Sequence, residues 1–185
     1  MGILDSLAAV VREADLQVLR ALYSRGHGSL RWGIWGLTWI GSGWSTLVLI
    51  PLASRPKTRE FALTLMGGIV TQGVVVWAIK AAIGRIRPWI AFGWPAPLWS
   101  PEDGSFPSGH SAGCFCVAAF LISWPRYGRE QCGAARPPMA IVALGVATLV
   151  AVSRVMAGAH YPSDVVGGAL LGSLVGIVAA RSRAF

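Results

Sequence analysis

The chain has 185 residues, of which 54% are hydrophobic and 13% are charged, and its mean hydropathy is +0.58. This balance excludes an ordinary water-soluble domain and favours a single membrane domain over residues 1–185. The net charge of +8 does not indicate nucleic-acid binding, because the 16 basic residues are scattered between apolar runs.

An amphipathic helix is predicted first, over Ile3 to Ser24. Its apolar residues recur every three or four positions, and its charged residues lie elsewhere. Arg12, Glu13 and Asp15 interrupt the apolar stretch and no small-residue cleavage site follows, which argues against a signal peptide. We expect residues 1–28 to form an interfacial helix on the membrane surface.

Five membrane spans are predicted after this helix. Trp32 to Leu52 and Phe61 to Ile83 are apolar and long enough to cross a hydrocarbon core of roughly 30 Å, which needs about 20 residues. Three shorter apolar helices complete the set: Ser108 to Trp124, Pro138 to Val155 and Ser163 to Ala180. The predicted fold is therefore an all-α, integral-membrane helical bundle.

The loop from Gly84 to Pro107 separates the second and third spans. Its prolines prevent a continuous helix, and its tryptophans are typical of anchors at the headgroup level: Trp89, Trp94 and Trp99. We interpret Glu102 and Asp103 as solvated charges and Arg85 as an interfacial arginine.

The lysines and arginines predict the orientation in the membrane. One side has eight of them with two acidic residues, in the link 54–59, the loop 126–136 and the tail after residue 180. This side is expected to be cytoplasmic. The opposite side is then the periplasmic face of a bacterial inner membrane.

Three polar clusters lie at the outward ends of the spans: Lys80 with Arg87-Pro88, Pro107-Ser108-Gly109-His110, and Ser153-Arg154 with His160 and Asp164. The first and the third carry positive charge. Lys80, Arg87 and Arg154 suit a tetrahedral dianion such as phosphate, because a guanidinium can bind two of its oxygens at once. Lys80 and Arg87 share a helix face if the helix continues past Gly84. Ionisable groups gathered at one face of an apolar bundle are candidates for a functional site.

The clusters also hold two histidines. Ser108 and Gly109 begin a span, where unpaired N–H groups favour an anion, and His110 can then donate a proton to a leaving oxygen. His160 and Asp164 are four residues apart, so the carboxylate can hold one imidazole nitrogen while the other attacks phosphorus.

No metal ion or other cofactor is expected. The three cysteines form no Cys-x-x-Cys pair, and no set of His and Cys residues has zinc-ligand spacing. Three fixed cations can stabilise the charge of a phosphoryl transfer instead.

The chain resembles the type 2 phosphatidic acid phosphatase superfamily at every position of three motifs: Lys80-x6-Arg87-Pro88, Pro107-Ser108-Gly109-His110 and Ser153-Arg154-x5-His160-x3-Asp164. The resemblance covers residues 80–164, which we interpret as the motif-bearing core. Membrane members of the superfamily commonly have six spans. Here the N-terminal helix is polar for a span, so the predicted count is five, or six if this helix also crosses the membrane.

The resemblance implies a metal-independent phosphatase with a phosphohistidine on His160. It implies that Asp164 supports this nucleophile, that His110 protonates the leaving group, and that five residues hold phosphate: Lys80, Arg87, Ser108, Gly109 and Arg154. The implied substrates are membrane lipids such as phosphatidic acid, phosphatidylglycerophosphate, polyprenyl pyrophosphate and lipid A. We favour a bacterial polyprenyl pyrophosphate or phospholipid phosphate. The bilayer is the expected partner, and the sequence indicates no oligomeric state.

Two other functions fit part of the pattern. Vanadium-dependent haloperoxidases of the same superfamily hold vanadate in a similar site, but they are soluble and much longer. A non-catalytic protein that binds or transports phospholipids would explain the three cations but not two histidines with an aspartate. The third histidine, His27, lies in a glycine-rich link and is interpreted as a solvated loop residue.

Overall fold

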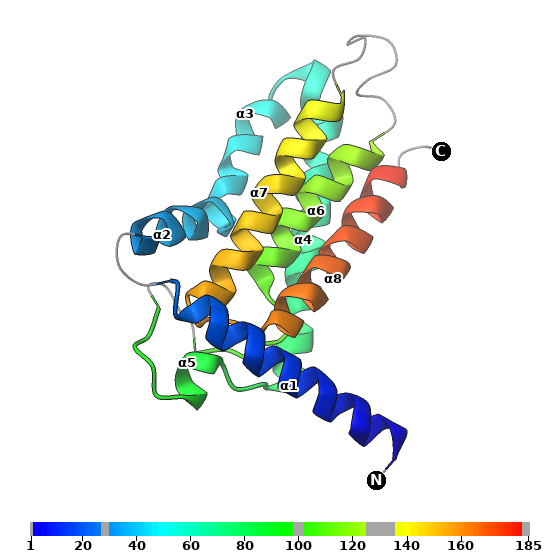
Figure 1. The fold of residues 1–185 in the computed structure, drawn as a ribbon. Helices are drawn as coiled ribbons and strands as arrows, with labels where there is room; N and C mark the ends of the chain where they lie inside the picture. Colours follow the sequence, from blue (N-terminus) through cyan, green and yellow to red (C-terminus); the bar gives the residue numbers. More distant parts are fainter. Residues whose placement is uncertain (1, 27–29, 98–101, 125–135, 183–185) are drawn as a thin grey trace.

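The computed structural model describes residues 2–26, 30–97, 102–124 and 136–182 (Figure 1). Predictions for His27, Trp99, Cys132 and the loop 126–135 lie outside these residues. Within them every regular element is a helix, which confirms the all-α class: α1 (Ile3–Tyr23), α2 (Leu30–Ile40), the 3-10 helix η1 (Gly43–Val48), α3 (Leu49–Ala53), α4 (Pro56–Ile83), α5 (Pro88–Ala91), α6 (Gly109–Ser123), α7 (Arg136–Met156) and α8 (Pro162–Arg181).

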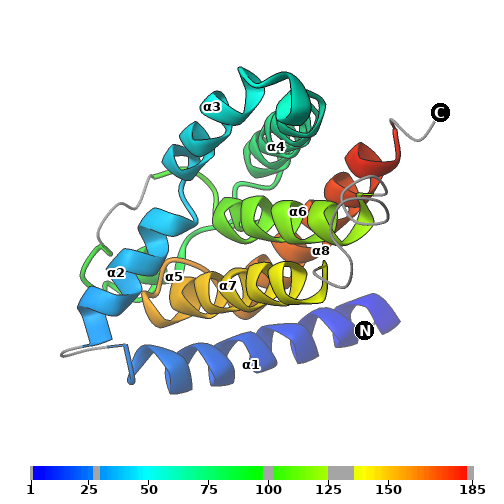
Figure 2. The ribbon, with the colours of Figure 1, turned by 90° about the horizontal axis from the view of Figure 1, so that it is seen from above.

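Helix α6 is the centre of the bundle and contacts α4, α7 and α8 (Figures 1 and 2). Gly168, Gly172 and Gly176 form a stripe on α8 at four-residue steps. A Cβ on any of them would collide with a backbone carbonyl of α6 or its N-cap: Ser108, Ala112 and Cys116 respectively. Small residues allow this close backbone approach, which fixes the start of α6 beside the start of α8.

Among the described residues, three helical segments are long and apolar enough to cross a membrane: Pro56–Ala91, which comprises α4 and the short α5, Pro138–Met156 and Pro162–Arg181. Gly109–Ser123 is a shorter apolar helix. Large apolar side chains on α4, α7 and α8 point outward, among them Val74, Ile141 and Leu170. These helices match four of the five predicted spans, and their exposed apolar faces suit contact with lipid.

The predicted first span, Trp32 to Leu52, is wrong as a continuous helix. The chain turns after Ile40, and the rest of the segment forms η1 and α3. Gly41 lies at the break and permits a close approach to the bundle, because a Cβ there would collide with Val150 of α7 and crowd His110 of α6. As a result α2 packs across α7 while α3 packs on α4 (Figure 1).

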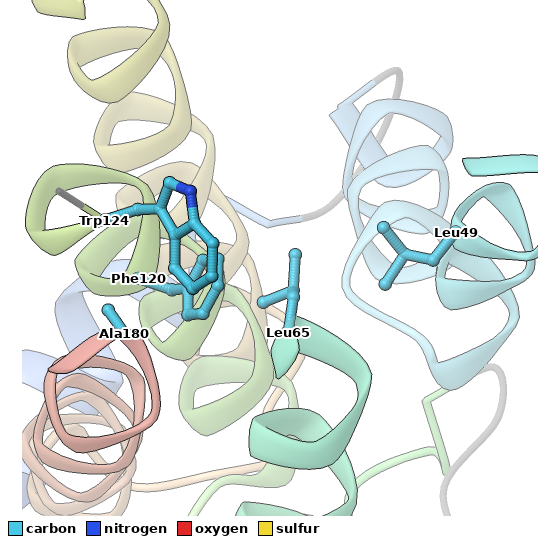
Figure 3. Packing of buried hydrophobic residues seen from close by; sticks show 5 residues of the cluster. All are labelled: Leu49, Leu65, Phe120, Trp124 and Ala180. Carbon is cyan, nitrogen blue, oxygen red and sulfur yellow. The ribbon is translucent and has the colours of Figure 1, made fainter. Parts of the chain in front are cut away.

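The main apolar cluster lies at the end of the bundle opposite to α5. It comprises Leu49, Leu65, Phe120, Trp124 and Ala180 (Figure 3). The rings of Phe120 and Trp124 stack with centroids 5.0 Å apart. This cluster joins α3, α4, α6 and α8, so the core that ties the bundle together is remote from the polar clusters.

Helix α1 lies across the end of the bundle that carries α5 (Figure 1). It packs against α7 and α8, and Leu19 is fully buried there. The predicted N-terminal helix is confirmed, and its crosswise position agrees with an interfacial helix. One charged residue of this helix, Asp15, is also buried.

Candidate active site

The three polar clusters of the sequence meet at one cavity of about 280 Å³. It lies at the ends of α4 and α7 and the start of α6, and its lining includes Lys80, Arg87, Gly109, His110, Arg154 and His160. Ser108 and Asp164 are fully buried behind it. Residues from three distant stretches of the chain therefore surround one space.

A shared helix face for Lys80 and Arg87 would require α4 to continue through Arg87. It does not. Gly84 ends the helix in the left-handed conformation, with φ 59°, and its N–H donates to the carbonyl of Lys80. Arg87 then has an extended backbone before Pro88. The turn, rather than a common helix face, brings Lys80 and Arg87 to the same cavity.

Asp103 forms ion pairs with two of the cavity's cations. Its carboxylate lies 3.0 Å from Nζ of Lys80 and accepts a hydrogen bond of 2.5 Å from Arg87. Burial alone would raise the pKa of Asp103, but the hydrogen bonds and charges of Arg87 and Lys80 outweigh burial and lower it. Asp103 is therefore an ion-pair partner in the site and not the solvated loop charge that the sequence analysis expected.

His160 follows α7 and has a defined tautomer. Its Nδ1 lies 2.8 Å from the carbonyl oxygen of Ser105, and its Nε2 lies 3.2 Å from a terminal nitrogen of Arg87. A carbonyl can only accept and a guanidinium can only donate, so Nδ1 carries the proton and Nε2 presents its lone pair. Because His160 lines the cavity, this lone pair belongs to a candidate nucleophile.

The charge state of His160 agrees with this tautomer. Burial lowers its pKa to about 4, and although Asp164 acts in the opposite direction, the positive charges of Arg87 and Arg154 lower it further. The imidazole is thus neutral at pH 7, and its unprotonated Nε2 has an electron pair that accepts a hydrogen bond from Arg87.

The sequence predicts a direct hydrogen bond between Asp164 and His160, and the structure does not have it. Oδ2 of Asp164 lies 3.7 Å from Nδ1, beyond hydrogen-bond distance, and accepts instead from the hydroxyl of Ser105 at 2.5 Å and the N–H of Tyr161 at 2.8 Å. The carboxylate and the imidazole are joined through Ser105, whose hydroxyl contacts one and whose carbonyl contacts the other. Ser105 is not predicted from the sequence, because nothing in the spacing of its loop marks it.

Arg85 was interpreted as an interfacial residue, but it makes three side-chain hydrogen bonds. Its guanidinium donates to Asp164 at 2.6 Å, Ser163 at 2.7 Å and Asp15 at 2.8 Å. It also lies over the ring of Tyr161, 4.1 Å from the centroid. Arg85 therefore binds the outer oxygen of Asp164 from behind the cavity.

The first turn of α6 faces the cavity with donors. Ser108 is the N-cap, and its own N–H donates to the carbonyl of Asp164 at 2.9 Å, which ties the two motifs together. In the turn that follows, the N–H of Ser111 donates to Oγ of Ser108 at 3.5 Å. The N–H groups of Gly109 and His110 precede the first i to i−4 bond of the helix, and Gly109 adds no side chain between them and the cavity. Nε2 of His110 is buried and has no hydrogen-bond partner in the described part of the chain.

Arg154 enters the cavity from the end of α7. It is almost fully buried, and one terminal nitrogen donates to Oγ1 of Thr38 on α2 at 2.8 Å. Its Nε has no partner among the described residues. Helix α2 thus helps to hold Arg154, the third cation of the cavity. The remaining N–H groups of this guanidinium can donate to a ligand.

A second, apolar cavity of about 540 Å³ adjoins the first. Gly109 and His110 line both cavities, and the rest of the second comes mainly from apolar residues of α4, α6 and α7 and the segment 40–49. The break between α2 and α3 therefore forms one wall of a space that begins at His110. An anion site beside an apolar cavity suits an amphiphilic ligand.

A model of the PAP2 superfamily matches residues 61–185 of the chain. The lipid A 1-phosphatase of Rhizobium johnstonii is 34% identical over 69% of this chain and 54% of its own length. Phosphatidylglycerophosphatase B of Bacillus subtilis is 37% identical over 76% of this chain and 68% of its own. The chain thus spans about half the length of the Rhizobium relative.

The fold has a solved counterpart. The crystal structure of a transmembrane PAP2-type phosphatidylglycerolphosphate phosphatase from Bacillus subtilis superposes with a TM-score of 0.76 and 28% identity. The match covers 92% of this chain and 84% of the other.

Proposed function

The chain belongs to the PAP2 superfamily, and from this premise we propose that it is an enzyme that hydrolyses a phosphomonoester or pyrophosphate of a membrane lipid. The observation that carries the proposal is the lone pair on Nε2 of His160, fixed by Ser105 and Arg87 inside a cavity lined by three cations. Neither halide oxidation nor transport is favoured by a particular contact of this site.

The substrate phosphate is proposed to bind Lys80, Arg87 and Arg154, with further N–H donors from the turn at Ser108 and Gly109. A dianion in this position would share or displace the contacts of Asp103, whose side chain is 46% exposed. Charge-assisted hydrogen bonds to arginine and lysine are strong enough to orient the phosphorus toward His160.

The reaction proceeds in two steps. Nε2 of His160 attacks phosphorus, the bond from phosphorus to the lipid oxygen breaks, and His110 donates its proton to that oxygen. A water molecule then attacks the phosphohistidine, His110 accepts one of its protons, and inorganic phosphate leaves. Asp164 and Ser105 hold the imidazole while it becomes positively charged.

The apolar cavity supports a lipid as the leaving group. His110 lines both cavities, so an oxygen protonated by His110 lies where they meet, and the hydrocarbon bonded to it can enter the apolar space. The two curated relatives are named for lipid A and phosphatidylglycerophosphate, which are both phosphorylated membrane lipids. We place the site on the outer face of a bacterial inner membrane, following the distribution of basic residues.

The test measures phosphate release by detergent-solubilised protein from phosphatidic acid, phosphatidylglycerophosphate, polyprenyl pyrophosphate and lipid A. EDTA is present throughout, and His160→Asn is the control. We expect wild-type protein to release phosphate from at least one lipid and the variant to release none. Folded wild-type protein that releases phosphate from no lipid, or only when a metal is added, would contradict the proposal.

A further inference from the structure

A buried carboxylate of the N-terminal helix contacts the rear of the site. Asp15 of α1 accepts hydrogen bonds from Arg85 at 2.8 Å, from the N–H of Ser163 at 2.8 Å and from the hydroxyl of Ser163 at 2.5 Å. Its side chain is 4% exposed. A buried carboxylate is costly unless donors surround it, so this set of contacts specifies how α1 docks.

Arg85 connects this carboxylate to Asp164. One terminal nitrogen of its planar guanidinium donates to Asp15, and the other donates to Oδ1 of Asp164 at 2.6 Å. Because the two ends of the fork are rigidly related, the position of Asp15 sets the direction from which Arg85 approaches Asp164. Without Asp15, the guanidinium, which is 29% exposed, could turn toward the solvent.

The other oxygen of Asp164 continues the connection. Oδ2 accepts from the hydroxyl of Ser105, and the carbonyl of Ser105 accepts from Nδ1 of His160. We propose that Asp15 and Arg85 are positioning residues for His160, acting through Asp164 and Ser105. Helix α1 is then a working part of the active site as well as an interfacial helix. The inference rests on the proposed role of His160 as nucleophile.

Charge gives the connection a second effect. A guanidinium paired with Asp164 alone would offset most of the negative charge that stabilises the imidazole as it becomes positive. Sharing that guanidinium with Asp15 leaves more negative charge available to His160. Loss of Asp15 should therefore slow attack on phosphorus without weakening phosphate binding, because Asp15 is remote from the cavity lining.

The experiment compares Asp15→Asn with Glu13→Gln in the full chain. Glu13 is the matched control, since it is an exposed carboxylate on the same helix whose side chain bonds Gln17. The rate constant of phosphoenzyme formation is measured in single-turnover quench reactions, together with its amplitude and the inhibition constant of inorganic phosphate. A substitution that only unfolds part of the protein lowers the amplitude, whereas a positioning residue changes the rate constant.

We expect Asp15→Asn to lower the rate constant about 10- to 100-fold, with amplitude and phosphate inhibition unchanged. Glu13→Gln should stay within about twofold of wild type. In an Asp164→Asn background, Asp15→Asn should have no further effect, because the two residues act along one path. Should Asp15→Asn fail to fold, Ser163→Ala replaces it and is expected to slow the same step less strongly.

Equal rate constants for Asp15→Asn and Glu13→Gln would overturn the inference, as would a loss of amplitude alone. A full additional loss in the Asp164→Asn background would overturn it too. Failure of the proposed function is distinguishable, because wild-type protein would then form no phosphoenzyme.

Discussion

The two ends of the α6–α8 pair differ in chemistry although one glycine stripe holds them together. At the end that carries the candidate site, Ser108 and Asp164 are completely buried and hydrogen-bonded to each other through the backbone. At the opposite end, Phe120 and Trp124 stack beside Ala180 in an apolar cluster. The same pair of helices therefore has a polar end and an apolar end.

The candidate site therefore lies at one end of these helices, and the apolar packing that stabilises the bundle lies at the other. Buried ionisable groups lower stability unless each is paired, and the site end satisfies them with a network of hydrogen bonds. Packing of apolar rings at the other end supplies contacts without such costs. Substitutions at the two ends should thus affect different measurements.

The largest effect is expected for His160→Asn. Removal of the proposed nucleophile should lower kcat at least about 1000-fold, as in other enzymes that lose a nucleophile, while the unfolding temperature changes little. Phosphate release and thermal unfolding in the same detergent check both parts. Substantial residual turnover would break the assignment of function to this end.

The converse is expected for Phe120→Ala. The cavity left in the apolar cluster should lower the free energy of unfolding by about 3 kcal/mol, because the surrounding helices cannot close it. The kcat of the protein that remains folded should stay near the wild-type value. A large loss of kcat at full occupancy of the folded state would show that the two ends are coupled.

Acid pH should lower the free energy of unfolding through the end that carries the candidate site. The pKa of His160 is about 4 in the folded protein against an ordinary value of 6.5, so the unfolded chain binds the proton first as the pH falls. Its contribution to stability is complete above pH 6.5 and is lost as the pH falls to about 4, by about 3 kcal/mol at most. Thermal unfolding across this range should show a smaller loss in His160→Asn than in wild type.

The smallest effect is expected for Asp103→Asn. The substitution removes the negative charge that pairs with Lys80 and Arg87, so inorganic phosphate should inhibit about fivefold more strongly. Glu102→Gln, at the neighbouring exposed residue, is the matched control. An unchanged inhibition constant for Asp103→Asn would show that phosphate does not compete with this carboxylate.

Much of this arrangement is readable from the sequence because it depends on local patterns. Apolar runs predict α4, α7 and α8, and motif spacing identifies His110, His160 and their cationic neighbours. The break at Gly41 is not predicted, since the close approach of this residue to Val150 and His110 exists only in the folded bundle.

Contacts made by loops are equally hidden. Ser105 binds both Asp164 and His160, yet its place in an irregular loop carries no periodicity. Asp15 precedes the buried Leu19 by one helical turn and so falls on the packed face of α1, but the structure identifies this face and the apolar pattern of the sequence does not. A charge on such a face indicates a buried partner, which here is Arg85.

The central claim is a covalent bond between phosphorus and Nε2 of His160. The direct measurement is a rapid quench of wild-type protein with a ³²P-labelled lipid substrate, followed by location of the label by mass spectrometry. The account predicts a transient, acid-labile label on the peptide that contains His160, absent from His160→Asn. Turnover without any labelled histidine, or with the label on another residue, would contradict it.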